Sequence, residues 1–397
     1  MLELNRLTVP VAEMAEALSG QRSVLRDQAD QARRTLKEQA QVTDELREKL
    51  KQAEKVDPSW RGADPLGDRL DELQELPKIV EPATLIASDG SQIYPDTHGI
   101  ALYYLLNVGT IILRQGSGEA PITATEARVG FEATDLFRQR GGGLIDNDEV
   151  NYRRDIWELQ VLALLSREER LALGGDLARG IVALGDGPLL PWMPQRLSDE
   201  EQRRRVKKYA GALDIMKKAA VFPFGYIDRP RSANILRLLH LAELSMEEIS
   251  KERLRQDNPY RGLADRSLFR YLAPGQRSAL FAATSEINRS YESQGHRIYF
   301  CFLNVANDRQ NPCVVRVEVP EWIARKQDQM DMALTSVLAD CRLTNYPYVL
   351  TRADELARVS RQEKDVFEQM LSVEMYRRGL AVALSSKQAQ KGFTGLN

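Results

Sequence analysis

Two apolar runs that each stop at an aspartate followed by glycine constrain this chain more than any other feature. Residues 85–88 lead into Asp89, and residues 181–185 lead into Asp186. An apolar run of this length predicts a buried strand, and the glycine lets the chain turn away at once. Aspartates at the ends of neighbouring strands would form an oxygen-rich site for Mg²⁺ or Mn²⁺, which suits phosphodiester hydrolysis.

Each aspartate also has a simpler interpretation as a turn residue. An Asp-Gly-Ser sequence such as that at Asp89 is common in turns, where the carboxylate accepts a hydrogen bond from the nearby backbone. Asp186 repeats the pattern, and the Gly187-Pro188 sequence after it prevents the strand from continuing. On these residues alone, metal binding and turn formation stay equally open.

Two further acids extend the candidate site. Glu158 lies among apolar neighbours in a predicted helix and is the best candidate for a third metal ligand. Asp354 opens the last predicted helix. Both have ordinary alternatives, because Glu158 could be an exposed helix residue and an acid in a first turn is favourable with the helix dipole.

Motifs for other chemistries are absent from the sequence. The three histidines show no metal-binding spacing, and the three cysteines form no CxxC pair. There is no GxxxxGK[ST] phosphate-binding loop and no GxSxG nucleophile motif. The chain therefore carries no ATPase motor motif of its own.

The composition is that of a globular protein with a sizeable core. Of the 397 residues, 43% are hydrophobic and 28% charged, and the formal net charge is −2. This balance is not basic overall, although residues 203–208 and 229–277 hold clusters of Arg and Lys, which are either solvated helix faces or contacts to a phosphate backbone. Without a signal-peptide pattern or an apolar span of about 18 residues, we expect a cytoplasmic protein that does not enter a membrane.

The chain divides into four predicted segments. Residues 1–56 carry a heptad-like apolar stripe, which predicts a long amphipathic helix or coiled coil. It could fold back on its own domain or serve as an arm for oligomerisation or a partner. Residues 57–79 are a predicted linker, residues 80–380 a domain with a mixed α/β sheet flanked by helices, and residues 381–397 a polar tail.

Within residues 80–380, strands alternate with helices in an order that differs from a regular dinucleotide-binding fold. Besides the strands that end at the two aspartates, predicted strands cover residues 101–106, 110–113, 221–227, 298–305 and 314–319. Predicted helices cover residues 152–172, a charged segment that Ser198 could cap, and residues 232–244, 320–341 and 351–378.

Taken together, these motifs resemble the NurA family of DNA-repair nucleases over about residues 80 to 380. Each motif is short, and their order and spacing carry the match. They are Asp89-Gly90-Ser91, Arg154-x-x-x-Glu158, Asp186-Gly187-Pro188, the segment 225–230 (GYIDRP) and Tyr346-Pro347 before a helix.

The resemblance implies an RNase H-like core, Mn²⁺-dependent or Mg²⁺-dependent cleavage of DNA, and a homodimer that works with a HerA-type hexameric ATPase. By this resemblance, Asp89 and Asp186 match metal-binding aspartates, Glu158 matches the acidic helix residue, and Tyr226 matches a family tyrosine. Tyr226 could stack on a base, orient a phosphate or be a core aromatic. Asp354 stands where many relatives have histidine, and an aspartate binds a hard cation as well as an imidazole does.

The acids favour metal-assisted phosphodiester hydrolysis, and the resemblance implies a metal-dependent deoxyribonuclease that acts as a 5′–3′ exonuclease, a single-strand endonuclease or both, in DNA end resection. In this hypothesis Asp89, Glu158, Asp186 and Asp354 hold the metal. The alternative is a catalytically silent adaptor with a nuclease fold that binds DNA or a helicase. The aspartate at position 354 favours the adaptor slightly, whereas the retained set of three other acids argues against it.

Overall fold

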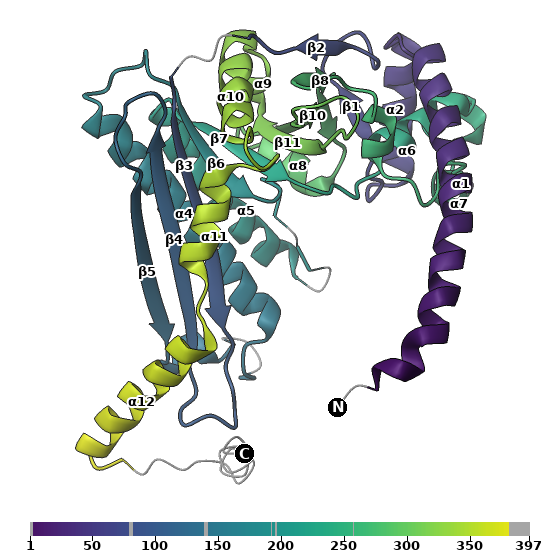
Figure 1. The fold of residues 1–397 in the computed structure, drawn as a ribbon. Coiled ribbons are helices and arrows are strands. Elements are labelled where there is room, and N and C mark those ends of the chain that lie inside the picture. Colours follow the sequence, from purple (N-terminus) through teal and green to yellow (C-terminus); the bar gives the residue numbers. More distant parts are fainter. Residues whose placement is uncertain are drawn as a thin grey trace. The chain divides into compact units, whose positions relative to one another are not determined.

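The computed structural model describes residues 3–78, 82–138, 142–191, 193–194, 197–256 and 258–380 (Figure 1). The chain forms two compact units. The first unit comprises Met1–Glu81, Asp186–Ala210 and Pro223–Tyr346, and the second comprises Pro82–Gly185, Gly211–Phe222 and Pro347–Asn397. The predicted division into segments 1–56, 57–79 and 80–380 does not coincide with these two units and stays a prediction. The predicted tail, residues 381–397, lies outside the described residues.

In its described residues, the second unit is built on four strands, with a mixed arrangement as predicted. The strands lie in the order β6-β3-β4-β5. β3, β4 and β5 form an antiparallel meander, and β6 pairs with β3 in parallel. Their bounds are β3 Thr84–Ile93, β4 Tyr104–Arg114, β5 Ile122–Gly130 and β6 Ile181–Asp186.

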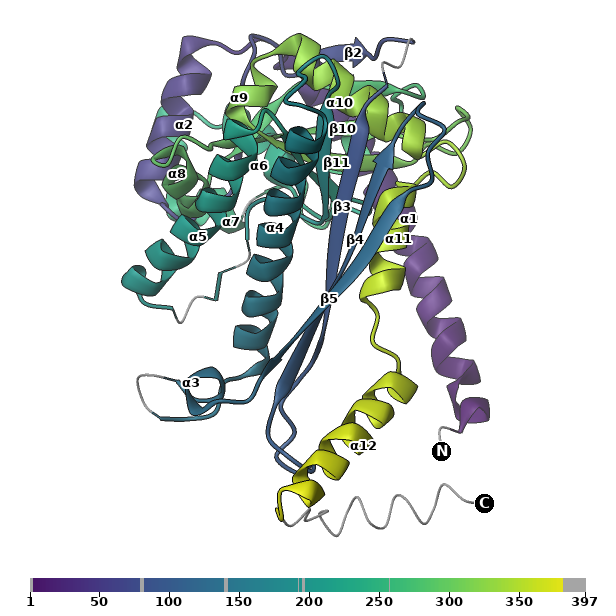
Figure 2. The same ribbon diagram turned by 90° about the vertical axis from the view of Figure 1, so that its left-hand side faces the viewer.

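Helices cover both faces of this sheet (Figure 2). α4 lies on one face and α11 on the other, and a core of apolar residues from β3, β6, α4 and α5 fills the α4 side. Asp146 caps the first turn of α4 by accepting a hydrogen bond from the Glu149 backbone N–H. The helices are α3 Ala133–Leu136, α4 Asn147–Ala172, α11 Tyr348–Ala357 and α12 Arg361–Arg377, and α5 Asp199–Lys218 ends in this unit.

The first unit holds a second group of strands, in the order β1-β9-β10-β11-β7, with β8 joining β2 to β10. The strands are β1 Ala63–Pro65, β2 Leu73–Glu75, β7 Phe222–Ile227, β8 Gln276–Ser278, β9 Phe281–Ala283, β10 Ile298–Asn304 and β11 Val314–Pro320. The helices are η1 Leu4–Leu7, α1 Thr8–Glu38, α2 Asp44–Val56, α6 Asn234–Glu243, η2 Met246–Glu248, α7 Lys251–Gln256, η3 Asp265–Phe269, α8 Glu286–Glu292, α9 Glu321–Ala324 and α10 Gln327–Asp340.

Most of the predicted elements are confirmed, and the errors concern continuity. The strands at 221–227, 298–305 and 314–319 and the helix at 232–244 correspond to β7, β10, β11 and α6, and Ser198 caps α5 through the Glu201 N–H. The single predicted helix 351–378 is wrong, because the chain breaks between α11 and α12 and Ser360 caps the second helix. The 320–341 helix is likewise divided into α9 and α10.

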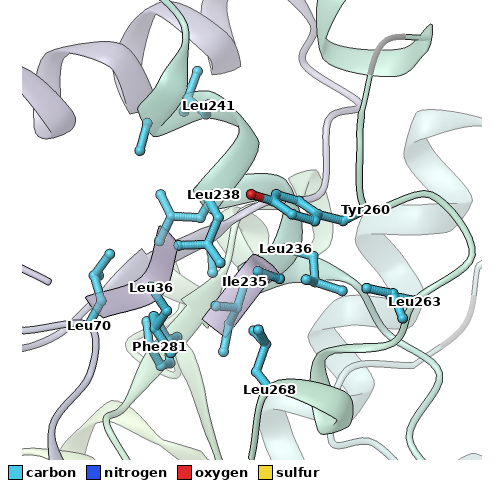
Figure 3. Packing of buried hydrophobic residues seen from close by; sticks show 14 of the residues in the cluster. Leu36, Leu70, Ile235, Leu236, Leu238, Leu241, Tyr260, Leu263, Leu268 and Phe281 are labelled. Atoms are coloured by element: carbon cyan, nitrogen blue, oxygen red, sulfur yellow. The ribbon is translucent and has the colours of Figure 1, made fainter. Parts of the chain in front are cut away.

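The N-terminal segment forms two helices rather than one. α1 ends at Glu38, and Thr43 caps α2 by accepting a hydrogen bond from the Leu46 N–H. Leu36 of α1 packs among α6 residues such as Ile235 in the core of the first unit (Figure 3), whereas Leu18 is 55% exposed. Residues 57–79, the predicted linker, contain β1, β2 and the fully buried Leu70.

Candidate active site

Asp89 and Asp186 follow matching positions on two parallel strands. The last partners in the register of β3 with β6 are Ser88 and Gly185, and the next residue of each strand is the predicted aspartate. Asp186 ends β6, as predicted. Asp89 does not end its strand, because β3 continues to Ile93 in pairing with β4. The predicted turn after Asp89 is therefore wrong.

The side chains of β3 alternate between the two helices that cover the sheet. Ser88 Oγ donates to the Glu158 carbonyl of α4 at 3.2 Å, whereas Ser91 Oγ donates to the Ala357 carbonyl of α11. Because successive strand residues point to opposite faces, Asp89 starts on the α11 face and Gly90 on the α4 face. One carboxylate oxygen of Asp89 accepts the Gly90 N–H at 2.8 Å.

Glu158 reaches the same short stretch of β3 from α4. A Cβ atom placed on Gly90 would lie 3.1 Å from Glu158 Oε2 and 2.8 Å from Arg154 Cγ. Glycine at position 90 leaves room for these two side chains, which occupy the space above it. The sequence thus correctly placed Glu158 near the strand that carries Asp89, on a helix that packs against that strand.

Arg154 is a functional candidate that the sequence reasoning did not assign. It donates to Gln92 Oε1 at 3.1 Å and pairs with Asp155. Burial opposes its charge, but the carboxylates of Asp155, Glu158 and Asp89 outweigh burial and raise the pKa of the guanidinium above its ordinary value. The signal in the sequence was the i,i+4 spacing of Arg154 and Glu158, which puts both on one helix face.

Asp354 lies in the second half of α11, so the prediction that it opens the helix is wrong. The helix starts at Tyr348, earlier than expected. The Asp354 side chain, 40% exposed, forms an ion pair with Arg358 one turn later. The preceding residue, Ala353, contacts the sheet: a Cβ on Gly109 would lie 2.6 Å from both the Ala353 carbonyl oxygen and the Ala357 nitrogen.

The segment after Asp186 is fixed by hydrogen bonds within the first unit. The Gly187 N–H donates to the Tyr226 carbonyl at 2.8 Å, and the Leu189 N–H donates to Glu318 Oε2 at 2.9 Å. Gly187 has φ 124°, a conformation that only glycine adopts readily. The predicted sharp exit of the chain after Asp186 is confirmed.

Glu318 belongs to a buried polar network. It accepts two hydrogen bonds from Arg316 at 2.9 and 2.7 Å, and Arg316 donates in turn to Asn234 and Ser232. Glu318 is 2% exposed and Arg316 5% exposed. Each charge therefore needs the other, because removal of one partner leaves an uncompensated buried charge. No local sequence pattern indicates this pair.

Tyr226 is fully buried in the first unit. Its ring lies edge-on to Tyr346 with 5.3 Å between the ring centroids, and burial raises the pKa of its hydroxyl above the ordinary range. This placement corresponds to the core-aromatic interpretation. A role in base stacking or phosphate orientation stays a prediction.

The chemistry of the acids suits a hard divalent cation, since carboxylate oxygens are its preferred ligands. Within the residues that the structure describes, however, no group of three or more His, Cys, Asp and Glu side chains is arranged to hold a metal ion. Glu158 approaches from α4, Asp89 starts on the opposite face, and Asp354 is paired with Arg358.

The predicted basic clusters are only partly available to bind a ligand. On α5, Arg203, Arg204, Lys207 and Lys208 are exposed, whereas Arg205 is buried beside Glu201. Of the arginines between 229 and 277, Arg277 is buried and Arg255 pairs with Asp57, whereas others such as Arg229 and Arg261 are exposed. Both clusters therefore keep exposed side chains that could contact a phosphate, although Arg204 on α5 pairs with Glu201.

Comparison with known proteins gives the class to which this fold belongs. The crystal structure of the NurA nuclease from Sulfolobus solfataricus is similar, with a TM-score of 0.50 and 13% identity, over 95% of this chain and 98% of that chain. The catalytic domain of human Endonuclease V gives a TM-score of 0.33 and 13% identity, over 73% of this chain and 85% of that chain. No curated protein matches the chain.

The fold is thus a mixed α/β sheet flanked by helices, as in a NurA nuclease. A model of the NurA domain matches residues 83–359. Since this match covers more than half of the sequence, the chain belongs to the NurA domain family. Among the helices in the described ranges, none is both long and apolar enough to cross a bilayer.

Proposed function

We propose that this chain is a divalent-metal-dependent deoxyribonuclease that hydrolyses phosphodiester bonds. The observation that carries the proposal is the coincidence of the NurA domain match with the acids. Residues 83–359 include Asp89, Glu158, Asp186 and Asp354. Asp89 and Asp186 directly follow the last paired residues of two parallel strands, and Glu158 packs over Gly90.

Asp89, Glu158 and Asp186 would hold the metal, Mn²⁺ or Mg²⁺, with Asp354 as a further ligand. We assign the metal ion to the part of β3 that follows Ser88, where the pairing of β3 with β6 ends. A bound ion of this kind lowers the pKa of water and stabilises negative charge on a phosphate. Asp354 would have to exchange its partner Arg358 for the ion.

The protein's own groups have definite tasks in this scheme. Arg154 offsets the repulsion between the carboxylates of Glu158 and Asp89 before a substrate arrives. The buried Glu318 and the Tyr226 carbonyl hold the backbone just after Asp186, which limits its motion. Exposed Arg and Lys in residues 203–208 and 229–277 would bind the DNA backbone through charge, without reading sequence.

The wider assignment is an extension of the family membership. We propose a cytoplasmic RNase H-like nuclease that acts on DNA ends as a 5′–3′ exonuclease, a single-strand endonuclease or both, as a homodimer with a HerA-type hexameric ATPase. The antiparallel β3-β4-β5 meander with β6 parallel to β3 supports the RNase H-like assignment. The lack of a phosphate-binding loop in the sequence supports a separate motor.

The direct test is cleavage of single-stranded and double-stranded DNA with Mn²⁺ by the parent, Asp89→Ala and Asp186→Ala. We expect each variant to lose at least about a hundredfold in rate, since a catalytic metal contributes several kcal/mol. Asp365→Ala, a change of an exposed aspartate on α12, is the matched control and should cut normally. If the Asp89 and Asp186 variants both cut at the parental rate, the site assignment fails.

The alternative function, a silent adaptor that binds DNA or a helicase, is favoured by one observation. Asp354 forms an ion pair with Arg358, so its charge is balanced without a metal ion. An adaptor would bind DNA equally well with or without Mn²⁺ and would leave it intact. Electrophoretic binding and cleavage assays on the same samples separate the two functions.

A further inference from the structure

β5 forms the outer edge of the sheet in the second unit. Within the described ranges its strand neighbour is β4 alone. The strand is nine residues long, and every residue before Gly130 is exposed. A long edge strand with a free row of N–H and C=O groups is a template for another strand.

The backbone of β5 alternates between β4 and solvent. Thr110 Oγ1 donates to the Ala124 carbonyl at 3.3 Å, which places that carbonyl on the β4 side. Because successive residues of a strand direct their backbone groups to opposite edges, those of Thr125, Ala127 and Val129 point outward. These three residues are therefore the ones available to a new strand.

The charges on β5 are self-complementary. The strand carries one acid and one base, Glu126 and Arg128, on the same face and 3.1 Å apart in an exposed ion pair. An exposed pair of this kind contributes little to stability, so an exchange of partners costs little.

We propose that β5 pairs antiparallel with β5 of a second copy of this chain, about a two-fold axis at Ala127. In this register Ala127 faces its own copy through outward backbone groups, and Glu126 of each chain lies opposite Arg128 of the other. An axis at Glu126 or at Arg128 would place like charges opposite each other, which is destabilising. An axis at Thr125 would leave both charges opposite uncharged residues. Charge complementarity therefore selects both the occupant and the register.

This interface deepens the homodimer of the proposed function, but it does not depend on metal binding or on DNA cleavage. A nuclease assay on the same samples keeps the two questions apart. Loss of cleavage in an intact dimer would refute only the enzyme assignment, and cleavage by a strict monomer would refute only this interface.

The first experiment is thiol cross-linking in a Cys313→Ser background, which removes the partly exposed native cysteine and leaves the two buried ones. Ala127→Cys should form a disulfide-linked dimer when a copper–phenanthroline oxidant is added. The matched control is Thr123→Cys, since in this register its two copies lie about 26 Å apart and a disulfide needs Cα atoms within about 7 Å. Equal cross-linking of both variants, or none at position 127, overturns the register.

The second experiment tests the charges by sedimentation. Glu126→Arg alone and Arg128→Glu alone each place like charges opposite each other, so each should weaken the dimer about tenfold. A 1:1 mixture of the two should restore it, because the mixed dimer again pairs opposite charges. Arg128 also lies over the Trp157 ring at 4.4 Å, so thermal unfolding of both variants checks that they stay folded. A parent that is monomeric at every concentration, or a mixture that dimerises no better than either variant, contradicts the proposal.

Discussion

A helix contacts each face of the β3–β4 pair at a glycine, but the two contacts differ in kind. On one face the side chains of Arg154 and Glu158 occupy the space above Gly90. On the other face the backbone of α11 lies against Gly109. Side chains can move when a neighbour grows, but a helix backbone cannot move without its helix.

This difference indicates how each face is used. The α4 side brings charge to β3 on flexible side chains that can adapt to a ligand. The α11 side is fixed, because Ser91 and Asn107 both donate to the Ala357 carbonyl near the end of that helix. The α4 side therefore carries adaptable charge, and the α11 side is a rigid support.

The largest expected effect comes from Gly109→Ala. The new Cβ would meet two backbone atoms of α11 at 2.6 Å, so the helix must shift, and we expect a loss of about 3 kcal/mol in the free energy of unfolding. Urea denaturation measures it. Gly211→Ala on α5 is the control, since nothing lies within 4 Å of its Cβ and alanine favours a helix. Equal stability of the two variants would show that α11 is not fixed.

Asn107→Ala should have the next largest effect. It removes hydrogen bonds to the Leu356 and Ala357 carbonyls, at 3.3 and 2.8 Å, and should cost about 1 to 2 kcal/mol. Ser91→Ala removes only a hydrogen bond to the Ala357 carbonyl, which still accepts one from Asn107, so the loss of stability should be smaller. Urea denaturation of the two single variants and the double variant compares the losses in free energy of unfolding. Strictly additive losses would contradict the view that Ser91 and Asn107 hold the same carbonyl.

Gly90→Ala should be mild for stability and severe for cleavage. Its Cβ meets flexible atoms of Arg154 and Glu158, which can turn aside at a cost of about 1 kcal/mol. Since this moves the charges of the proposed site, the cleavage rate should fall by more than the stability loss explains. Gly185→Ala, whose Cβ meets nothing within 4 Å, is the paired control. Parental cleavage by Gly90→Ala would remove α4 from the site.

Asp354→Asn should have the smallest effect on folding. Its ion pair with Arg358 is exposed, so its loss changes stability by less than about 0.5 kcal/mol. Arg358→Ala breaks the same pair but keeps the carboxylate. If Asp354 binds the metal, only Asp354→Asn should weaken Mn²⁺ binding in calorimetry. The same affinity in both variants would exclude Asp354 as a ligand.

The sequence predicted the elements that carry the acids better than it predicted the bounds of the strands around them. The strand end at Asp186, the helix that carries Glu158 and the exit at Gly187 were predicted because apolar runs, helix spacing and glycine are local signals. The predicted break between residues 106 and 110 was wrong, because Asn107 and Gly109 look unfavourable in a strand. Both are explained by contacts with α11, about 250 residues later in the sequence.

Other parts of the site depend on contacts that no local pattern encodes. The buried Arg316–Glu318 pair lies in a strand whose alternation looks ordinary, and its link to Leu189 spans 129 residues. The exposed strand β5 was not predicted, since its small and polar residues lack the apolar character of the buried strands. The ion pair between Asp354 and Arg358 could not be predicted, because the predicted helix started too late and placed Asp354 in its first turn.

The central claim is that Asp89 and Asp186 form one metal site, and calorimetric titration with Mn²⁺ in the absence of DNA tests it most directly. We expect saturable binding by the parent. We expect a loss of at least about tenfold in Mn²⁺ affinity for Asp89→Asn and for Asp186→Asn, since a direct ligand should matter at least as much as a residue that only contacts a ligand. Equal affinity in the parent and both variants, or no binding by the parent, would contradict it.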